Sequence, residues 1–451
     1  MTKIKIHRGA RQIGGSITEI YTDDTHIFID FGSELSVDPK KSTDGAMVER
    51  IKKAKCDAVL FTHYHGDHVG LIEHIPSKDT RGRTIRLAMG TTARGVLDNI
   101  HKTLLEFDEI SEEQKQYHEN YRRILGDKER RLDLTDGEDL VIGDFIITPV
   151  MVDHSAYDAY LFVIESKTDH KVIVHTGDFR THGRLGEDLF EKVKKGLRGR
   201  TVDILITEGT MMSRLTEVVK TEKEMQREAY ELLRLPENKY AFLICSSTNM
   251  ESLASFANAA WQVKENGDKG RKLFVSSYVL EQIKLYRKTA GEEDWNFKFY
   301  NANALEGMNY VNPKLGMTQM EYMEKHGFVM LIRPVEGYLK RIQYFKDKGY
   351  DPLLIYSMWE GYVDREKYPD TYQEELGDFY HSWKKERRVD LHTSGHATAG
   401  DIRKMILTVA PKAGILPIHT QEPEAFQKLE IGKYADRIIT YEEDEVIELQ
   451  G

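Results

Sequence analysis

The stretch FTHYHGDHVG, residues 61–70, follows the apolar run DAVL and gathers three imidazoles and one carboxylate within six positions. These four side chains belong to His63, His65, Asp67 and His68. A strand that ends in such a cluster points its polar side chains at one spot, and imidazole together with carboxylate suits zinc or a similar divalent ion. A solvated polar turn is the alternative, but it gives no reason for so dense a set of ligand types. We therefore predict a metal site.

The composition is that of a soluble globular protein with room for two or three domains, because the 451 residues are 40% hydrophobic and 31% charged. No apolar run approaches the roughly 18 residues that a membrane span needs, so we expect no membrane partner. The first residues, MTKIKIHRGA, lack the apolar core of a signal peptide.

Cysteine usage and net charge narrow the location and the class of partner. Cys56 and Cys245 lie in apolar runs without a CxxC partner, which favours a reducing compartment and a cytoplasmic location. The net charge of −10 excludes a generally basic surface for nucleic acid. It leaves open a locally positive groove, or a cleft where metal ions supply the positive charge.

The pattern of apolar runs divides the chain into two α/β parts. In residues 1–210, short apolar runs each end in a histidine or an acidic residue, which places these side chains along one edge of a sheet. Residues 211–386 alternate between helix and strand patterns, which predicts crossover helices and a parallel sheet. Residues 387–451 return to histidine-bearing strand ends, so we expect them to complete the first domain.

Seven of the residues at strand ends are enough ligands for two metal ions. One ion would be held by His63, His65 and His154, the other by Asp67, His68 and His419, with Asp178 as the bridge. Two cations about 3.5–4 Å apart can activate a shared hydroxide and neutralise a phosphoryl centre during attack. The carboxylates fit because they hold a second cation without adding positive charge. We expect two divalent ions, zinc first and manganese as the alternative.

The order of the motifs resembles the metallo-β-lactamase superfamily, with an early Asp30 followed by HYHGDH, His154 and TGDFR. Three later motifs look like motifs A, B and C of its β-CASP nuclease branch: Glu208 in ITEGT, His396 in TSGHA and His419 in LPIHT. The opening GARQIGGSITEI also resembles that branch. The likeness extends over the whole chain.

The resemblance implies a fold, an activity and several residue roles. The fold would be an αββα sandwich with an inserted β-CASP domain that contains a parallel sheet. The activity would be hydrolysis of RNA by a two-metal phosphodiesterase, with Asp67 and Asp178 as catalytic ligands. Asp30 would orient ligands without binding metal. Glu208 would accept a hydrogen bond from His396, which would be the general acid for the leaving oxygen.

The segment HTSGHATAGD, residues 392–401, resembles the RNase J version of motif B. Its residues Ser394, Gly395, His396 and Thr398 precede a predicted helix, and helix N-termini with hydroxyls and free N–H groups bind anions. We therefore expect a pocket for a 5′-phosphate, and an enzyme that degrades 5′-monophosphorylated RNA from that end, cuts internally, or does both. The alternative for Ser394 and Thr398 is a simple N-cap turn.

Several alternatives remain open from the sequence. A lactamase-fold hydrolase of a small ester, thioester or lactam would share the metal loop, although the inserted domain with Glu208 and His396 argues against it. A β-CASP DNA nuclease is the second alternative. Within the resemblance, a histidine at position 419 favours RNA, and a non-catalytic RNA-binding scaffold would have lost ligands. The third motif continues as IHTQEP, where RNase J-like chains usually read His-Gly-Glu. A homo-oligomer is also left open.

Overall fold

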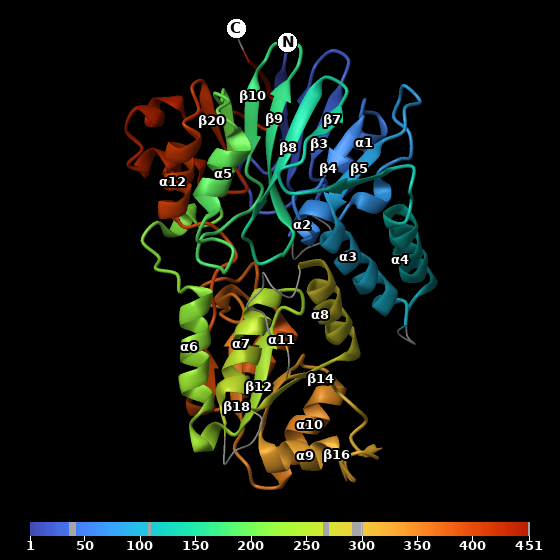
Figure 1. The fold of residues 1–451 in the computed structure, drawn as a ribbon, viewed down its shortest axis with the longest axis vertical. Helices are drawn as coiled ribbons and strands as arrows, with labels where there is room; N and C mark the ends of the chain where they lie inside the picture. Colours follow the sequence, from blue (N-terminus) through green and yellow to red (C-terminus); the bar gives the residue numbers. More distant parts are fainter. Residues whose placement is uncertain (36–41, 107–109, 265–269, 291–298, 300, 450–451) are drawn as a thin grey trace. The chain divides into compact units, whose positions relative to one another are not determined.

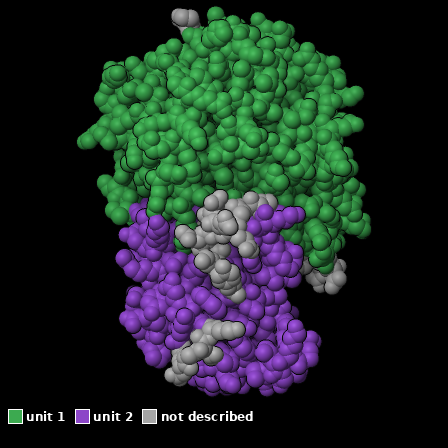
Figure 2. Space-filling model, in the orientation of Figure 1, with its two compact units in different colours: residues 1–218, 395–451 green, residues 219–394 purple. Residues whose placement is uncertain are grey.

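The computed structural model describes residues 1–35, 42–106, 110–264, 270–290, 299 and 301–449. The chain folds into two compact units, coloured separately in Figure 2. Unit 1 consists of Met1–Val218 together with Gly395–Gly451, and unit 2 is the continuous segment Val219–Ser394. Unit 1 is therefore assembled from two segments that are far apart in the sequence.

The first sheet of unit 1 has the strand order β21–β1–β2–β3–β4–β5–β6. Its strands are β21 (Val446–Glu448), β1 (Lys3–Arg8), β2 (Ile17–Tyr21), β3 (His26–Ile29), β4 (Ala58–Leu60), β5 (Arg86–Gly90) and β6 (Arg131–Leu134). Pairing is antiparallel from β21 to β3 and parallel from β3 to β6. Side chains alternate across the pleat, so that Ile4 and Ile6 of β1 are buried while Lys3 and Lys5 are partly exposed.

The second sheet of unit 1 has the order β20–β11–β10–β9–β8–β7. Its strands are β20 (Gly414–Ile418), β11 (Ile204–Glu208), β10 (Val172–His175), β9 (Ala159–Ser166), β8 (Phe145–Val152) and β7 (Leu140–Ile142). The strands from β7 to β10 are antiparallel, and β10, β11 and β20 are parallel. The returning segment of the chain thus supplies an edge strand to each sheet, β20 here and β21 in the first.

Two hydrophobic layers hold unit 1 together. One combines residues of both sheets, such as Ile29 and Leu60 with Phe162 and Ile206, and therefore lies between the sheets. The other packs the second face of the β20–β7 sheet against α5 (Leu189–Leu197) and α12 (Ala399–Val409). Full burial of one large aliphatic side chain contributes about 1.5–3 kcal/mol, so these layers dominate the stability.

The remaining helices of unit 1 accompany the first sheet. They are α1 (Asp44–Lys52), the single turn α2 (Gly66–Val69), α3 (Thr91–Leu104) and α4 (Glu112–Leu125). In Figure 1 they lie on the opposite side of the two sheets from α5 and α12. This gives an α/β sandwich with a mixed first and second sheet, and the α/β class expected from the sequence is confirmed.

Unit 2 is built on a sheet with the order β14–β13–β17–β12–β18–β19, in which every neighbouring pair is parallel. Its strands are β12 (Tyr240–Cys245), β13 (Lys272–Val275), β14 (Ala302–Ala304), β17 (Phe328–Leu331), β18 (Leu353–Ser357) and β19 (Arg388–Asp390). Its helices are α6 (Glu222–Leu233), α7 (Met250–Gln262), α8 (Ser277–Ala290), α9 (Gln319–His326), α10 (Glu336–Asp347) and α11 (Glu374–His381), and β15 (Val311–Asn312) pairs with β16 (Met317–Thr318). The parallel sheet follows from the strand–helix alternation in the sequence.

The boundary between the units differs from the expected 211–386. The strand β19 forms a parallel ladder with β18, so residues 387–394 belong with the second unit, although the sequence analysis assigned them to the first. At the other end, unit 2 begins at Val219. None of the described helices combines the length and the apolar character that crossing a bilayer requires.

Candidate metal centre

The expected metal ligands all belong to unit 1 and lie at or just beyond strand ends. The loop after β4 carries His63, His65, Asp67 and His68, with α2 turning the last two inward. Three further candidate ligands each follow a strand: His154 after β8, Asp178 after β10 and His419 after β20. The expected acid pair comes from two other elements, with Glu208 at the end of β11 and His396 before α12. Residues separated by up to 356 positions, His63 and His419, thus reach one edge of the sandwich.

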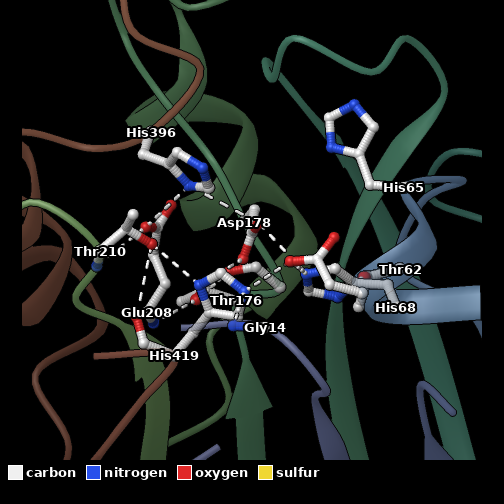
Figure 3. Close-up of polar contacts among 12 residues, drawn as sticks. Gly14, Thr62, His65, His68, Thr176, Asp178, Glu208, Thr210, His396 and His419 are labelled. Carbon is white, nitrogen blue, oxygen red and sulfur yellow. Dashed lines mark hydrogen bonds and ion pairs between the residues drawn. The ribbon is translucent and has the colours of Figure 1, made fainter. Parts of the chain in front are cut away.

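The ligand atoms fall into overlapping groups, each with its members within 4.8 Å of one another. One group is His63, His65 and His154, and another is Asp67, His68 and His419. Asp178 joins both sides, in one group with His63 and His68 and in another with His154 and His396. The structure therefore brings together the seven residues expected to hold two ions. Figure 3 shows Asp178 between His396 and His68.

Asp30 orients His68. The His68 Nδ1–H group donates to Asp30 Oδ2 at 2.7 Å, and Asp30 also accepts hydrogen bonds from the backbone and hydroxyl of Thr62 at 2.7 and 2.8 Å. Burial raises the pKa of Asp30, although His68 opposes this shift. With Nδ1 used in this way, His68 turns Nε2 towards Asp178, whose Oδ2 lies 3.2 Å away. A carboxylate that fixes the tautomer of a ligating histidine is a common arrangement in metal sites.

Gly395 orients His154 in the same manner. The His154 Nδ1–H group donates to the Gly395 carbonyl oxygen at 2.6 Å, which leaves the Nε2 lone pair facing His65 Nδ1 at 3.2 Å. A Cβ atom on Gly395 would lie 2.5 Å from Ser155 Oγ, so only glycine brings its carbonyl this close. The contact that the structure shows for Gly395 is thus with a candidate metal ligand.

The donor set fits divalent cations. His63 Nε2 is buried without a hydrogen-bond partner among the described residues, and its distance to Asp178 Oδ2 is 3.9 Å. Burial lowers the pKa of His63 and His154 well below the usual range and that of His65 to about 4, so these imidazoles are neutral and offer lone pairs. Neutral imidazoles that converge with a carboxylate, one nitrogen lacking any other partner, are what zinc or manganese requires.

The two central carboxylates are ionised. Burial works against ionisation of Asp178, but the surrounding His419 and His68 hold its pKa well below the usual range. Asp67 shows the same competition, in which His68 and His419 outweigh burial and lower its pKa. Both carboxylates can therefore bind cations at neutral pH without first losing a proton.

His396 is paired with a fully buried glutamate. Its Nδ1 lies 3.2 Å from Glu208 Oε2 and 3.6 Å from Asp178 Oδ2. Glu208 is held by the backbone N–H of Phe179 at 2.9 Å. Burial alone would lower the pKa of His396, but Glu208 and then Asp178 raise it to about 9. A quarter of the His396 side chain is exposed, so this protonated imidazole is accessible to a substrate.

Three groups lie at hydrogen-bonding distance from the ring nitrogens of His419, and two of them, Gly14 and Thr210, were not predicted from the sequence. His419 Nε2 lies 3.1 Å from Asp67 Oδ2 and 3.0 Å from the amide nitrogen of Gly14, and His419 Nδ1 lies 2.9 Å from Thr210 Oγ1. Thr210 stands two residues after Glu208, and Gly14 lies in the glycine-rich opening segment. One indication of both residues was present in the sequence: Thr210 lies in the ITEGT motif of Glu208, and Gly14 lies in the opening segment GARQIGGSITEI.

Of the expected phosphate-binding residues, Thr398 has a structural role that differs from the expectation. The Thr398 hydroxyl accepts from the backbone of Asp401 at 3.2 Å and donates to the Asp401 carboxylate at 2.8 Å, so it is the N-cap of α12. Asp401 also accepts from the Thr181 hydroxyl at 2.6 Å, which ties this cap to the loop after Asp178. The N-cap alternative therefore describes Thr398. Ser394 is the last residue of unit 2 and is half-buried.

Comparisons with known proteins agree with this fold. Residues 30–244 match a family model described as a Beta-lactamase superfamily domain, a segment that includes the candidate ligands up to Asp178 and also Glu208. A solved structure titled "Crystal Structure of a Protein of Unknown Function from Enterococcus faecalis V583" is similar with a TM-score of 0.70. The two sequences are 19% identical, and the likeness covers 99% of each chain. A search of curated proteins finds no match.

Proposed function

We propose that this protein is a metal-dependent phosphodiesterase that hydrolyses RNA with two divalent cations, zinc or manganese. The observation that carries the proposal is the pair of ligand groups, His63–His65–His154 and Asp67–His68–His419, with Asp178 in contact with both sides. A single tetrahedral ion uses four ligands at most, so seven converging donors favour two ions. The match of residues 30–244 to a Beta-lactamase superfamily domain supports a hydrolase.

The side chains around the ions have separate tasks in this proposal. Bound at this site, two divalent ions supply Lewis-acid activation of water and neutralise charge on a phosphoryl group. His396 directs its Nδ1 proton at Glu208, and the raised pKa of about 9 keeps a second proton on the ring for the leaving oxygen. Asp30 and the Gly395 carbonyl hold His68 and His154 with their other nitrogens turned towards the centre.

RNA is proposed as the substrate because residues 392–401 resemble the RNase J version of motif B. In addition, position 419 of motif C is a histidine, which goes with the RNA-processing members of the β-CASP branch. We extend the proposal to a preference for 5′-monophosphate ends, held by Ser394 and by backbone N–H groups that precede α12, since the Thr398 hydroxyl is engaged in the helix cap. Cys56 and Cys245 are both free and buried, which supports a cytoplasmic setting.

One experiment separates this function from its alternatives. The metal-loaded protein is incubated with end-labelled RNA, single-stranded DNA of the same sequence and a chromogenic lactam, and the His396→Ala variant serves as the matched control. We expect wild-type protein to cleave RNA fastest and the variant to lose this cleavage. Faster cleavage of DNA would identify a DNA nuclease. Turnover of the lactam alone, unaffected by the substitution, would identify a small-molecule hydrolase.

A further inference from the structure

The backbone amide of Gly14 is aimed at a metal ligand. Its nitrogen lies 3.0 Å from His419 Nε2, and Figure 3 shows Gly14 beside the His419 ring. The other ring nitrogen lies 2.9 Å from Thr210 Oγ1, which accepts the proton when His419 carries it on Nδ1. In that tautomer the Nε2 lone pair accepts the hydrogen bond from Gly14.

The same lone pair is the one that a metal ion needs. Asp67 Oδ2 lies 3.1 Å from His419 Nε2, so both atoms can share one ion. A nitrogen that binds an ion cannot also accept a hydrogen bond, because it has a single lone pair in the ring plane. Binding of a second ion by His419 Nε2 would therefore remove the acceptor of the Gly14 amide. Gly14 is buried, and a buried N–H group without an acceptor is unfavourable.

We propose that the Gly14 amide binds the substrate: in the metal-loaded site it donates a hydrogen bond to a non-bridging oxygen of the phosphoryl group. The inference rests on the proposed function and assigns a substrate contact to a residue outside the ligand set. A backbone N–H aimed at developing negative charge acts as an oxyanion donor, and such donors are effective when they are fixed before the reaction.

The loop around Gly14 is fixed in this way. The buried Arg8 donates from Nε to the Gly15 carbonyl at 2.8 Å and from Nη1 to Asp44 at 2.8 Å. The Ser16 amide donates to the Asp67 carbonyl at 3.0 Å, and the His419 amide donates to the Gly9 carbonyl at 2.7 Å. The loop is thus bonded to Asp67 and His419, two of the three residues that would hold the second ion, independently of the Gly14 amide.

Glycine is required at position 14 by its conformation and by its surroundings. Its φ is 86°, in the left-handed region that side chains disfavour. A Cβ atom there would lie 2.6 Å from Leu35 Cγ and 3.3 Å from Asp67 Cβ. The absence of a side chain therefore allows the amide to approach the metal ligands closely.

A titration followed by NMR tests the proposal without nucleic acid. Protein labelled with ¹³C at isoleucine carbonyls and ¹⁵N at glycine gives correlations only for Ile–Gly pairs, of which the sequence contains three, at Gly14, Gly143 and Gly432. Zinc is added first and inorganic phosphate second, and phosphate binding is followed through its ³¹P signal. We expect zinc to shift the Gly14 signal, and phosphate to shift it again downfield and slow its hydrogen exchange. The other two signals are internal controls.

Three results of this titration would each overturn the proposal. A Gly14 signal that ignores zinc would overturn the proposal, because the amide would keep its bond to His419. A signal that responds to zinc but ignores bound phosphate would overturn it as well, and so would a metal-loaded protein that binds no phosphate. Because the titration contains no RNA, it can fail while RNA is cleaved, or succeed on a protein that cleaves none, so the two proposals fail separately.

A backbone ester supplies a second test. Replacing Gly14 by glycolic acid exchanges the N–H for an oxygen and keeps the backbone geometry. We expect kcat on RNA to fall by about 10²–10³-fold, the usual loss for one oxyanion donor, while zinc content stays at the wild-type level. The matched control is the same ester at Gly82, which shares a left-handed φ of 77° and donates to the Asp79 carbonyl in a turn away from the site. Equal kcat values for the two esters would overturn the proposal.

Discussion

His154 and Gly395 are 241 positions apart, and the hydrogen bond from His154 Nδ1 to the Gly395 carbonyl oxygen is 2.6 Å long. It joins the loop after β8 to the segment that returns from unit 2. The first segment of unit 1 thus contains a candidate metal ligand whose orientation depends on the second segment. The centre is consequently a property of the complete unit and cannot be reduced to the HYHGDH loop.

The substitution Gly395→Ala tests this dependence. The added Cβ would lie 2.5 Å from Ser155 Oγ and 3.5 Å from His154 Cε1, so the carbonyl must move away from His154. We expect zinc affinity to fall about 10–100-fold, as for other groups that orient ligands. The measurement is competition with a chelator. Gly400→Ala is the control, because its nearest neighbour is Thr398 Oγ1 at 3.6 Å, and an unchanged affinity in Gly395→Ala would contradict the orienting role.

Two ions per chain are expected, and Asp178→Ala should cost both of them. Asp178 is the residue whose ligand atom groups with His63 and His68 and also with His154. Elemental analysis of well-loaded protein measures the stoichiometry, with Asp98→Ala as the control because that aspartate pairs with Arg122 at the surface. One ion in the wild type, or full loading of Asp178→Ala, would refute the two-metal centre.

His396→Ala should reduce RNA cleavage by about 10²–10⁴-fold, the usual contribution of a general acid, and leave zinc content intact. In contrast, His63→Ala should lose metal. If both variants lose zinc equally, His396 is a ligand and the general-acid assignment is wrong.

The pH profile gives an independent check of the His396–Glu208 pair. Since a general acid must be protonated and the pKa of His396 is raised to about 9, activity should fall as the pH rises through about 9. Glu208→Gln removes the negative charge that causes most of the rise. Its alkaline limb should therefore move to lower pH, and an unmoved limb would assign that limb to another group.

The 5′ end of the RNA should affect the rate. We expect 5′-monophosphate RNA to be cleaved faster than the 5′-hydroxyl form, because a terminal phosphate can pair with donors that the hydroxyl leaves unsatisfied. Ser394→Ala should reduce this difference, and Thr398→Ser, which keeps the helix-capping hydroxyl, is the control. Equal rates on 5′-monophosphate, 5′-triphosphate and 5′-hydroxyl RNA would indicate internal cleavage without recognition of the end.

Acid should destabilise unit 1 through Glu19. Burial opposes ionisation of Glu19, but hydrogen bonds from His26 at 2.7 Å and His7 at 2.9 Å lower its pKa to about 2 from 4.5. Its contribution to stability is therefore present above about pH 4.5 and is lost as the pH falls towards 2.

Urea unfolding at pH 7 and pH 4 measures this contribution. Glu19→Gln should be less stable than wild type by a few kcal/mol at pH 7, and the difference should shrink at pH 4. Glu448→Gln, an exposed partner of Lys3, is the control. A difference that stays constant with pH would show that Glu19 acts through packing and not through its charge.

The sequence predicted that His63, His154, Asp178 and His419 lie close together, because the apolar runs that they follow are local signals. The contacts that orient these ligands were less predictable. The hydrogen bond from His154 to the Gly395 carbonyl depends on how two distant segments meet. Because the acceptor is a backbone carbonyl of glycine, no side chain in the sequence indicates it. Arg8 likewise gave no signal, because a fully buried arginine that binds the Gly15 carbonyl looks like any surface arginine in the sequence.

The boundary of unit 2 shows the same limit. The short run RVDL reads as a strand, but its sequence does not say which sheet accepts it, and pairing with β18 places β19 in unit 2. At Thr398 two hypotheses were compatible with the motif, a phosphate contact or a helix cap. The capping contacts with Asp401 distinguish them, because they use the hydroxyl both as acceptor and as donor.

The division of unit 1 into Met1–Val218 and Gly395–Gly451 has a consequence for synthesis on the ribosome. The four ligands of residues 63–68 emerge early, but His419 is translated only after all of unit 2. A nascent chain that stalls inside unit 2 lacks the proposed general acid His396, the candidate ligand His419 and the strand β20. Under the proposed function, such a fragment would be inert towards the messenger and ribosomal RNA around it, and translation order would delay cleavage until nearly the whole polypeptide has been made.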